Sequence, residues 1–331
     1  MKSIVEPRLY THISISTSED YHNIRAARLF RTLHTRPDLA RNIITFKGTF
    51  YPAPPKHRSP PVTPLSFITN WNKERLIRKQ EQAICETIVA SIHHMVNIKT
   101  LLLRDFGWLG TPYQNLVHNA ISSTVSLSSL TDLTLLGAAF DRPPRHEDYG
   151  LELSLLLRGL PLLECLRLQS GDWDLQGYIL QSDVPRLGRL QARSHEAKLL
   201  VPGRPITGLC ITELFELPDP DEWRFLAASA VPLTFFAIDD TESPEVLKSV
   251  LHSVAKHFKD VQKLRIFGCI YSTMDVLVKE FPSFPSLRNI HIRGWGIHKG
   301  GEKKIESRRL DAITHIRSVN PQFQNLAINN W

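Results

Sequence analysis

The feature that most constrains this chain is a spacing of apolar residues that recurs from residue 98 to residue 328. An apolar residue is followed three positions later by a second one and two positions after that by a third. Alternate side chains of a β-strand face the same side, so the second and third members of each set would be buried together. The sets are Ile98/Leu101/Leu103, Leu130/Leu133/Leu135, Leu163/Leu166/Leu168, Leu187/Leu190/Ala192, Ile206/Leu209/Ile211, Leu233/Phe236/Ile238, Val261/Leu264/Ile266, Leu287/Ile290/Ile292 and Phe323/Leu326/Ile328. This pattern predicts a series of short, similar strands.

Spacing and proline positions support a repeat better than the apolar matches do, because about nine such matches are expected by chance in an apolar-rich chain. The second apolar position advances from 101 to 133, 166, 190, 209, 236, 264, 290 and 326. Most of these steps lie near the 20 to 29 residues of a leucine-rich repeat. Pro161, Pro185, Pro285 and Pro321 each stand two residues before a set, where a fixed φ suits the entry to a strand.

Together these regularities predict an α/β fold, a leucine-rich-repeat solenoid with a curved parallel sheet on its concave face and helices and loops outside. Residues 1–50 form its N-terminal strand–helix–strand start, residues 51–66 a proline-rich insertion, and residues 67–331 the solenoid proper. The start is predicted as a strand over 11–16, a helix from Asp20 that stops before Pro37, and a strand over 43–46.

Helices are predicted between several of the strands. They are expected over 74–95, over 218–230, and after a cap at Ser243. The 19-residue step from Leu190 to Leu209 is too short for a full helix, so a loop is expected there.

Composition narrows the class of protein. The net charge of +7 favours acidic partners but is too mild and too evenly spread to indicate nucleic acid. No window holds the roughly 18 uncharged apolar residues of a membrane span, and the first residues contain no apolar signal-peptide core. We therefore expect a cytoplasmic or nuclear protein. The four cysteines are spread out, which indicates reduced thiols.

No motif predicts catalysis, a cofactor or a metal. His93 and His94 are adjacent on a predicted helix and point in different directions, so they cannot share a metal ion. Asp239 and Asp240 follow a strand, where paired carboxylates are more often turn residues than an acid–base pair. We expect a protein that is not an enzyme; an enzyme with a scattered site is a distant alternative.

The strand positions between the buried apolar residues are more informative. Few acids occur there, namely Asp132 and Asp239. A basic stripe on the concave face could dock a protein partner through an acidic or phosphorylated segment. The predicted partner-binding residues are Arg104, Arg167, Arg189, Arg193, Lys263, Arg265, His291 and Arg293.

Several segments resemble one protein family. Residues 4–15, the helix at 26–33 and the repeats at 160–166 and 284–290 are similar to the stretch after the F-box, and to the repeats, of fungal (basidiomycete-type) F-box/leucine-rich-repeat proteins. The resemblance implies the substrate-recognition part of a ubiquitin ligase receptor. The F-box, which docks on the adaptor of a cullin-type ligase, would precede residue 1 and is absent from this sequence. Binding to the adaptor is therefore left open, and a structural scaffold unconnected to ubiquitin is the alternative.

Overall fold

The computed structural model describes residues 9–16, 20–49, 87, 90–104, 127–136, 149–169, 175–212, 220–241, 243–280, 284–295 and 302–330. The proline-rich stretch 51–66 and most of the helix predicted over 74–95 lie outside these ranges. The chain divides into two compact units, Met1–Val184 and Pro185–Trp331.

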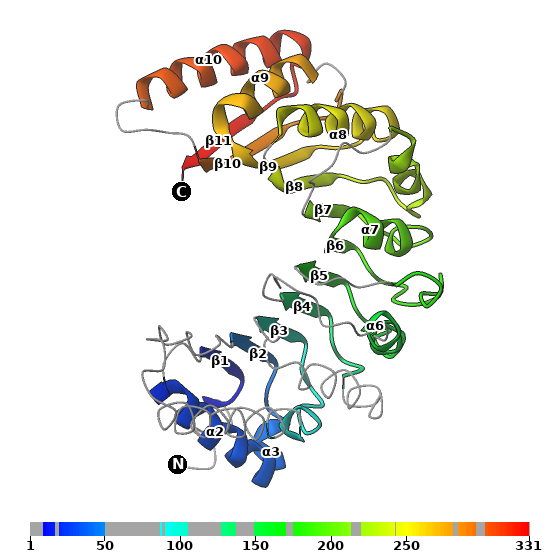
Figure 1. Cartoon of the computed structure of the whole chain (residues 1–331), viewed down its shortest axis with the longest axis vertical. Helices are drawn as coiled ribbons and strands as arrows, with labels where there is room; N and C mark the ends of the chain where they lie inside the picture. The colour runs from blue at the N-terminus through cyan, green and yellow to red at the C-terminus, as the bar shows by residue number, and fades with distance from the viewer. Residues whose placement is uncertain are drawn as a thin grey trace, which may run out of the picture. The chain divides into compact units, whose positions relative to one another are not determined.

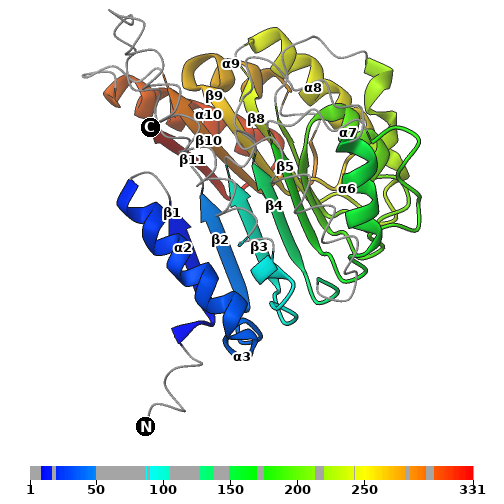
Figure 2. The same ribbon diagram turned by 60° about the horizontal axis from the view of Figure 1, so that its bottom comes forward.

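The first unit contains five parallel strands that pair in chain order (Figure 1). They are β1 (His12–Ser16), β2 (Thr45–Thr49), β3 (Thr100–Arg104), β4 (Asp132–Leu136) and β5 (Cys165–Gln169). Its described helices are α2 (Asp20–Thr35), α3 (Pro37–Ala40) and α6 (Tyr149–Arg158). In Figure 2, α2 and α3 lie beside β1 and β2, and α6 lies beside β4 and β5. The strand predicted over 43–46 begins at Thr45 instead, because Ile43 closes a turn with Ala40 (N to O, 3.1 Å).

The second unit contains six parallel strands, again paired in chain order. They are β6 (Arg189–Ala192), β7 (Gly208–Thr212), β8 (Phe235–Thr241), β9 (Lys263–Cys269), β10 (Asn289–Trp295) and β11 (Asn325–Asn330). Between them come α7 (Ser194–Leu200), the 3-10 helix η2 (Pro220–Ala228), α8 (Pro244–His257), α9 (Ile270–Glu280) and α10 (Glu302–Val319). The helices pack on one face of the strands; α9 lies on β9 and β10, and α10 on β11. We call the opposite face, which no described helix covers, the open face (Figure 1).

The second and third members of the nine predicted apolar sets lie on β3 to β11, and the first member of each set lies two residues before its strand. All members are buried except Ile328, which is half-buried. The strand β2 follows the same pattern, since Ile43 and Phe46 are fully buried. Each strand therefore contributes an equivalent row of side chains to the core. The arrangement is α/β with parallel strands and helices on one side, as the apolar spacing predicts.

A four-residue turn precedes many of the strands and explains the proline positions. The N–H of Leu163 donates to the carbonyl of Leu160 (3.2 Å), and the N–H of Leu287 donates to that of Phe284 (3.2 Å). Pro161 and Pro285 are the second residues of these turns, where a φ near −65° is required. The prolines thus lie in the turn, four residues before the strand begins, rather than at the strand entry.

The same pair of backbone hydrogen bonds joins each strand to the next. The carbonyl of Thr131 accepts from the N–H groups of Glu164 (2.8 Å) and Cys165 (2.9 Å). Equivalent pairs occur at all nine strand-to-strand steps within the two units, four in the first and five in the second. Because the bond pattern does not change, successive strands stack in an equivalent way although the connections between them differ in length.

The short step between Leu190 and Leu209 contains the two-turn helix α7, so the prediction of a loop alone was wrong. The helix fits because it begins directly after β6, where the N–H of Arg193 donates to Oε2 of Glu196 (2.9 Å). The chain then reverses at Gly203, whose φ of 73° favours glycine.

The helix predicted over 218–230 is a 3-10 helix, Pro220–Ala228, rather than an α-helix. Trp223 and Leu226 are three positions apart and almost fully buried. A helix of three residues per turn places this pair on the same side.

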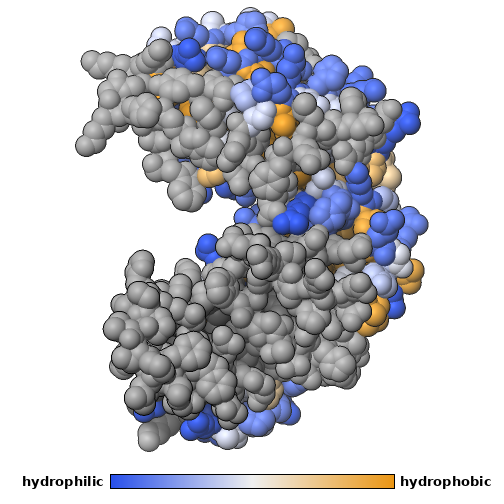
Figure 3. Space-filling view, in the orientation of Figure 1, coloured by the Kyte–Doolittle hydropathy of each residue, from blue (hydrophilic) through white to orange (hydrophobic). Residues whose placement is uncertain are grey.

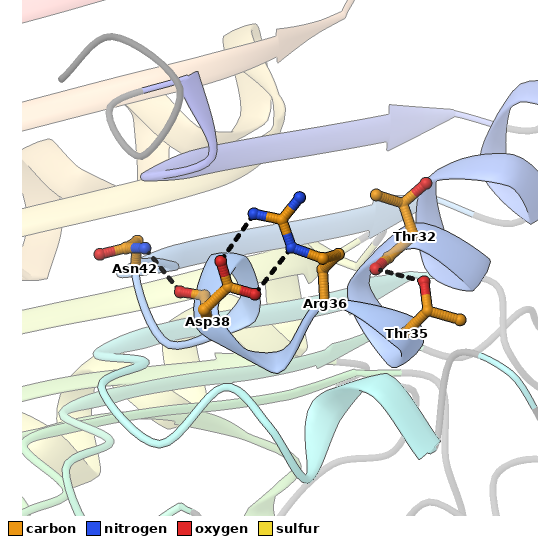
Figure 4. A network of polar contacts seen from close by, with 5 residues as sticks. All are labelled: Thr32, Thr35, Arg36, Asp38 and Asn42. Carbon is orange, nitrogen blue, oxygen red and sulfur yellow. Dashed lines mark hydrogen bonds and ion pairs between the residues drawn. The ribbon is translucent and has the colours of Figure 1, made fainter. Parts of the chain in front are cut away.

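The helix from Asp20 ends at Thr35, just before Pro37 as predicted, and polar contacts order the turn that follows (Figure 4). Both Nε and Nη2 of Arg36 donate to the carboxylate of Asp38 (2.9 and 2.7 Å), and Nδ2 of Asn42 donates to the carbonyl of Asp38 (2.7 Å). The hydrogen bond from Arg36 lowers the pKa of Asp38 below its ordinary value, so this carboxylate stays charged.

Candidate functional site

The eight predicted partner-binding residues do not form one continuous stripe. In the first unit β4 lies between Arg104 on β3 and Arg167 on β5. The β4 residue aligned with Arg167 is the buried Thr134. In the second unit Arg189 lies on β6 and Arg193 directly follows that strand, whereas β7 and β8 separate them from β9.

The other four predicted residues come together on β9 and β10, which are neighbouring strands. Arg265 is paired with His291 across the sheet, while Lys263 pairs with Asn289 and Phe267 with Arg293. Paired residues of a sheet lie about 4.8 Å apart, so these cations occupy one patch of the open face. We call Lys263, Arg265, His291 and Arg293 the β9–β10 cluster. Lys263, Arg265 and Arg293 are exposed, and His291 is half-buried.

The inward-facing residues of the two strands that carry the cluster are apolar and pack in the core. Leu264 and Ile266 on β9 alternate with the cations and are almost fully buried, as are Ile290 and Ile292 on β10. Helix α9 packs on both strands from the side opposite the open face. The alternation that builds the core therefore also orients the four charged side chains outward.

His291 is the group whose protonation the cluster controls. Burial lowers its pKa, and the nearby positive charges of Arg265 and Arg293 lower it further. Nε2 of His291 lies 3.0 Å from Nδ2 of Asn329 on β11, and the donor of this contact depends on the tautomer of the ring. At neutral pH the three remaining cations supply the charge of the cluster.

Acidic groups are scarce around the cluster. Those outward positions of β9, β10 and β11 whose side chains the structure describes contain lysine, arginine, histidine, asparagine, phenylalanine and alanine but no carboxylate. Lys263 and Arg265 form no ion pair with any residue that the structure describes. Asp239 on β8 is the acidic residue at an outward position of the neighbouring strand. The patch is therefore net positive.

Asn329 belongs to this site but was not among the predicted residues. Asn329 is paired with Arg293 of β10. It stands two residues after Ala327, which is paired with His291. The apolar spacing could have identified it, because Asn325, Ala327 and Asn329 alternate with Leu326 and Ile328 in the last set. The predicted partner-binding set was limited to basic residues, so the neutral amide of Asn329 was not in it.

The helix side of the second unit has a different surface. Figure 3 shows mainly hydrophilic residues over α8, α9 and α10, with hydrophobic ones scattered between them. Leu310 and Val319, at 55% and 52% exposed, are the large apolar side chains of α10 that reach the surface. Isolated apolar residues of this kind are normal on a protein surface, so the charged open face is the more distinctive feature.

Other candidate chemistry is limited within the described residues. They contain no group of three or more His, Cys, Asp or Glu side chains placed to hold a metal ion. Burial, and then the charge of His94, lowers the pKa of His93. Among the helices that the structure describes, none is long and apolar enough to cross a membrane.

No protein-family model matches the chain, and no curated protein matches it either.

The arrangement suits recognition of an extended anionic segment. Arginine guanidinium groups bind carboxylates or phosphates through paired N–H donors, and lysine adds a point charge. Phe267 and Asn289 lie beside the cations on the same two strands and offer apolar and amide contacts.

Proposed function

We propose that this chain is a leucine-rich-repeat protein-interaction module that binds an acidic segment of its partner through the open face. The repeat assignment is supported by the turn, the parallel strand and the alternating helices or short connections that recur along both units. The unchanged bond pattern between strands is the stacking expected of a solenoid, in which each repeat contacts its neighbours.

The β9–β10 cluster is the observation that carries the proposal. It combines exposed cations on a rigid, well-packed pair of strands with an absence of carboxylates at the outward positions of β9 to β11 that the structure describes. Positive patches of this kind accelerate encounter with acidic partners and select against basic ones. Because the side chains stand on strands rather than on loops, little ordering is needed when the partner binds.

A peptide titration tests the surface directly. The probe is a fluorescently labelled glutamate-rich peptide, and its anisotropy reports binding to the full chain. Replacing Arg265 and Arg293 by Glu should weaken binding at least about tenfold, since two exposed charge contacts of about 0.7 kcal/mol each are lost and the new carboxylates repel the peptide. The matched control replaces Lys248 and Lys256 by Glu; both are exposed on α8, away from the open face.

The control separates site binding from a general charge effect, because both double variants change the net charge equally. The proposal requires the control to bind like the unmodified chain. Equal weakening by both variants, or no weakening by either, would contradict it. Raising the salt concentration should also weaken binding of the unmodified chain, because the contacts are exposed.

The biological role we propose is the substrate-recognition part of an F-box-like ubiquitin ligase receptor. Its support is the resemblance of residues 4–15 and of the repeats at 160–166 and 284–290 to that family. Affinity purification of the full chain, with quantitative mass spectrometry, tests this role. Recovery of the cullin adaptor together with cluster-dependent partners would support this role. Recovery of such partners without the adaptor would favour a scaffold unconnected to ubiquitin.

A further inference from the structure

We propose that the outer edge of β11 is a strand-addition surface that two arginines of α10 hold closed, and that its occupant, once it is opened, is β11 of a second copy of this chain. The inference does not depend on what the β9–β10 cluster binds. It rests on the hydrogen bonds at the last strand of the second unit.

The first observation is the partner of the Gln324 carbonyl. At each earlier step the equivalent carbonyl accepts two N–H groups of the next strand; that of Arg288, for example, accepts from Gln324 (2.8 Å) and Asn325 (3.2 Å). The Gln324 carbonyl accepts instead from Nη2 of Arg317, at 3.2 Å. A side chain of α10 therefore takes the position that a further strand's backbone would occupy.

The second observation is the carbonyl of Leu326, two residues further along the strand. Carbonyls two residues apart in a strand point to the same side, so this one also faces away from β10. It accepts from Nε of Arg309 at 2.8 Å. Nη1 of Arg309 is in turn held by both carboxylate oxygens of Glu306, at 3.0 and 3.1 Å. The guanidinium is thus fixed across the edge.

The third observation is an incompletely covered apolar side chain. Ile328 is half-buried, whereas the residues at its position in the preceding strands, Ile238, Ile266 and Ile292, are at most 1% exposed. Its strand has no neighbour on its outer side among the described residues. The edge therefore offers both backbone acceptors and apolar surface, the two features that promote strand addition.

A second copy is the occupant because β11 is complementary to itself. In an antiparallel pair centred on Ala327, the backbone groups of Leu326 in each copy would face those of Ile328 in the other copy. The strand Asn325–Asn330 carries no charged residue, so the two copies would not repel each other along it. A two-fold pair also closes, so it leads to a dimer and not to a fibre.

The test removes the two arginines from the full chain. The unmodified chain should have the mass of a monomer by size-exclusion chromatography with light scattering. The double variant Arg309→Ala/Arg317→Ala should move to the mass of a dimer as its concentration rises. A matched control, Arg308→Ala/Lys256→Ala, removes two exposed or half-exposed cations of α10 and α8 and should stay monomeric.

A cross-link then checks the geometry. Residues opposite each other in a non-hydrogen-bonded antiparallel pair have Cα atoms about 4.5 Å apart, which is within reach of a disulfide. Adding Ala327→Cys to the double variant should give a disulfide-linked dimer through residue 327 under mild oxidation, identified by peptide mass spectrometry. The double variant without this cysteine should not give that link.

Three outcomes would overturn the proposal: a folded double variant that stays monomeric at the highest concentration reached, a dimeric unmodified chain, or a dimer that does not cross-link through residue 327. If circular dichroism shows that the double variant does not fold, the single variants Arg309→Ala and Arg317→Ala replace it. Dimer formation by either single variant supports the proposal, and monomers in both overturn it.

Discussion

Replacing Asn320 by alanine should weaken the attachment of α10 and β11 to the rest of the second unit. Asn320 follows α10 and is 6% exposed. Its Nδ2 donates to the carbonyls of Pro285 (3.1 Å) and Leu287 (3.0 Å), both in the turn before β10. Its Oδ1 accepts from the N–H of Gln322 (3.0 Å). One side chain thus joins the turns of two successive strands.

The expected cost follows from these bonds. Alanine would leave two carbonyls and one N–H without this partner, and the contact with Leu287 is buried. A polar group left unpaired in the interior costs about 1–3 kcal/mol, and more when water cannot reach it. Counting the two carbonyl contacts and allowing for partial hydration gives about 2–4 kcal/mol. The equilibrium for opening this part of the unit should therefore rise about 30- to 700-fold, at 1.4 kcal/mol for each factor of ten.

Native-state hydrogen exchange, read by mass spectrometry on peptides that cover β10, α10 and β11, measures this opening locally. Urea unfolding of the full chain supplements it and is fitted with a separate transition for each of the two units. Asn325→Ala is the matched control, because Asn325 is exposed and its substitution should change stability by less than about 0.5 kcal/mol. If Asn320→Ala changes the hydrogen exchange and the free energy of unfolding no more than the control does, the reasoning that this side chain connects the two turns is refuted.

Three further predictions follow from single contacts. Gly294→Ala should lower the free energy of unfolding by about 1–3 kcal/mol, measured by urea unfolding, because its Cβ would overlap the backbone of Gly268, with the carbonyl carbon at 2.8 Å. An unchanged midpoint would contradict this close approach. Ser243→Ala should cost about 0.5–1 kcal/mol in the same assay, since its hydroxyl accepts from the N–H of Val246 at 3.4 Å and caps α8. The folded state holds the pKa of His291 below 6.5, so folding stability falls as the pH drops through that value, and an anionic peptide should bind more tightly at about pH 5.5 than at about pH 7.5. His291→Ala should remove that pH difference in the anisotropy titration, and a difference that persists would exclude His291 as its source.

Apolar spacing located the strands well because it reports a local property of the chain. Leu163, just before β5, and Leu166 and Leu168 on β5 are all fully buried, and the equivalent residues before and on β10 are almost fully so. The cap at Ser243 was also confirmed, since a hydroxyl that accepts from a nearby N–H requires only residues close in sequence. The proline positions identified the right segments, but their role lies in the preceding turn. Whether the repeat belongs to the leucine-rich class stays a proposal.

The connections between strands were harder to predict because they depend on what they pack against. Helix α7 forms in a step judged too short for one, since Ala197 and Leu200 are buried in the unit. Helix η2 adopts a 3-10 geometry, with Trp223 and Leu226 almost fully buried in the unit. Neither outcome follows from helix propensity, which tertiary contacts routinely override.

The sequence by itself determined which residues of each strand are buried and which face outward, because that alternation is a property of every extended chain. The tertiary structure decided which outward residues become neighbours. Arg265 and His291 are 26 positions apart in sequence and are paired across β9 and β10, whereas Arg104 and Arg167 are kept apart by β4. It also decided that Arg309 and Arg317 cover the edge of β11. These contacts depend on how repeats of unequal length stack, and no local spacing encodes that.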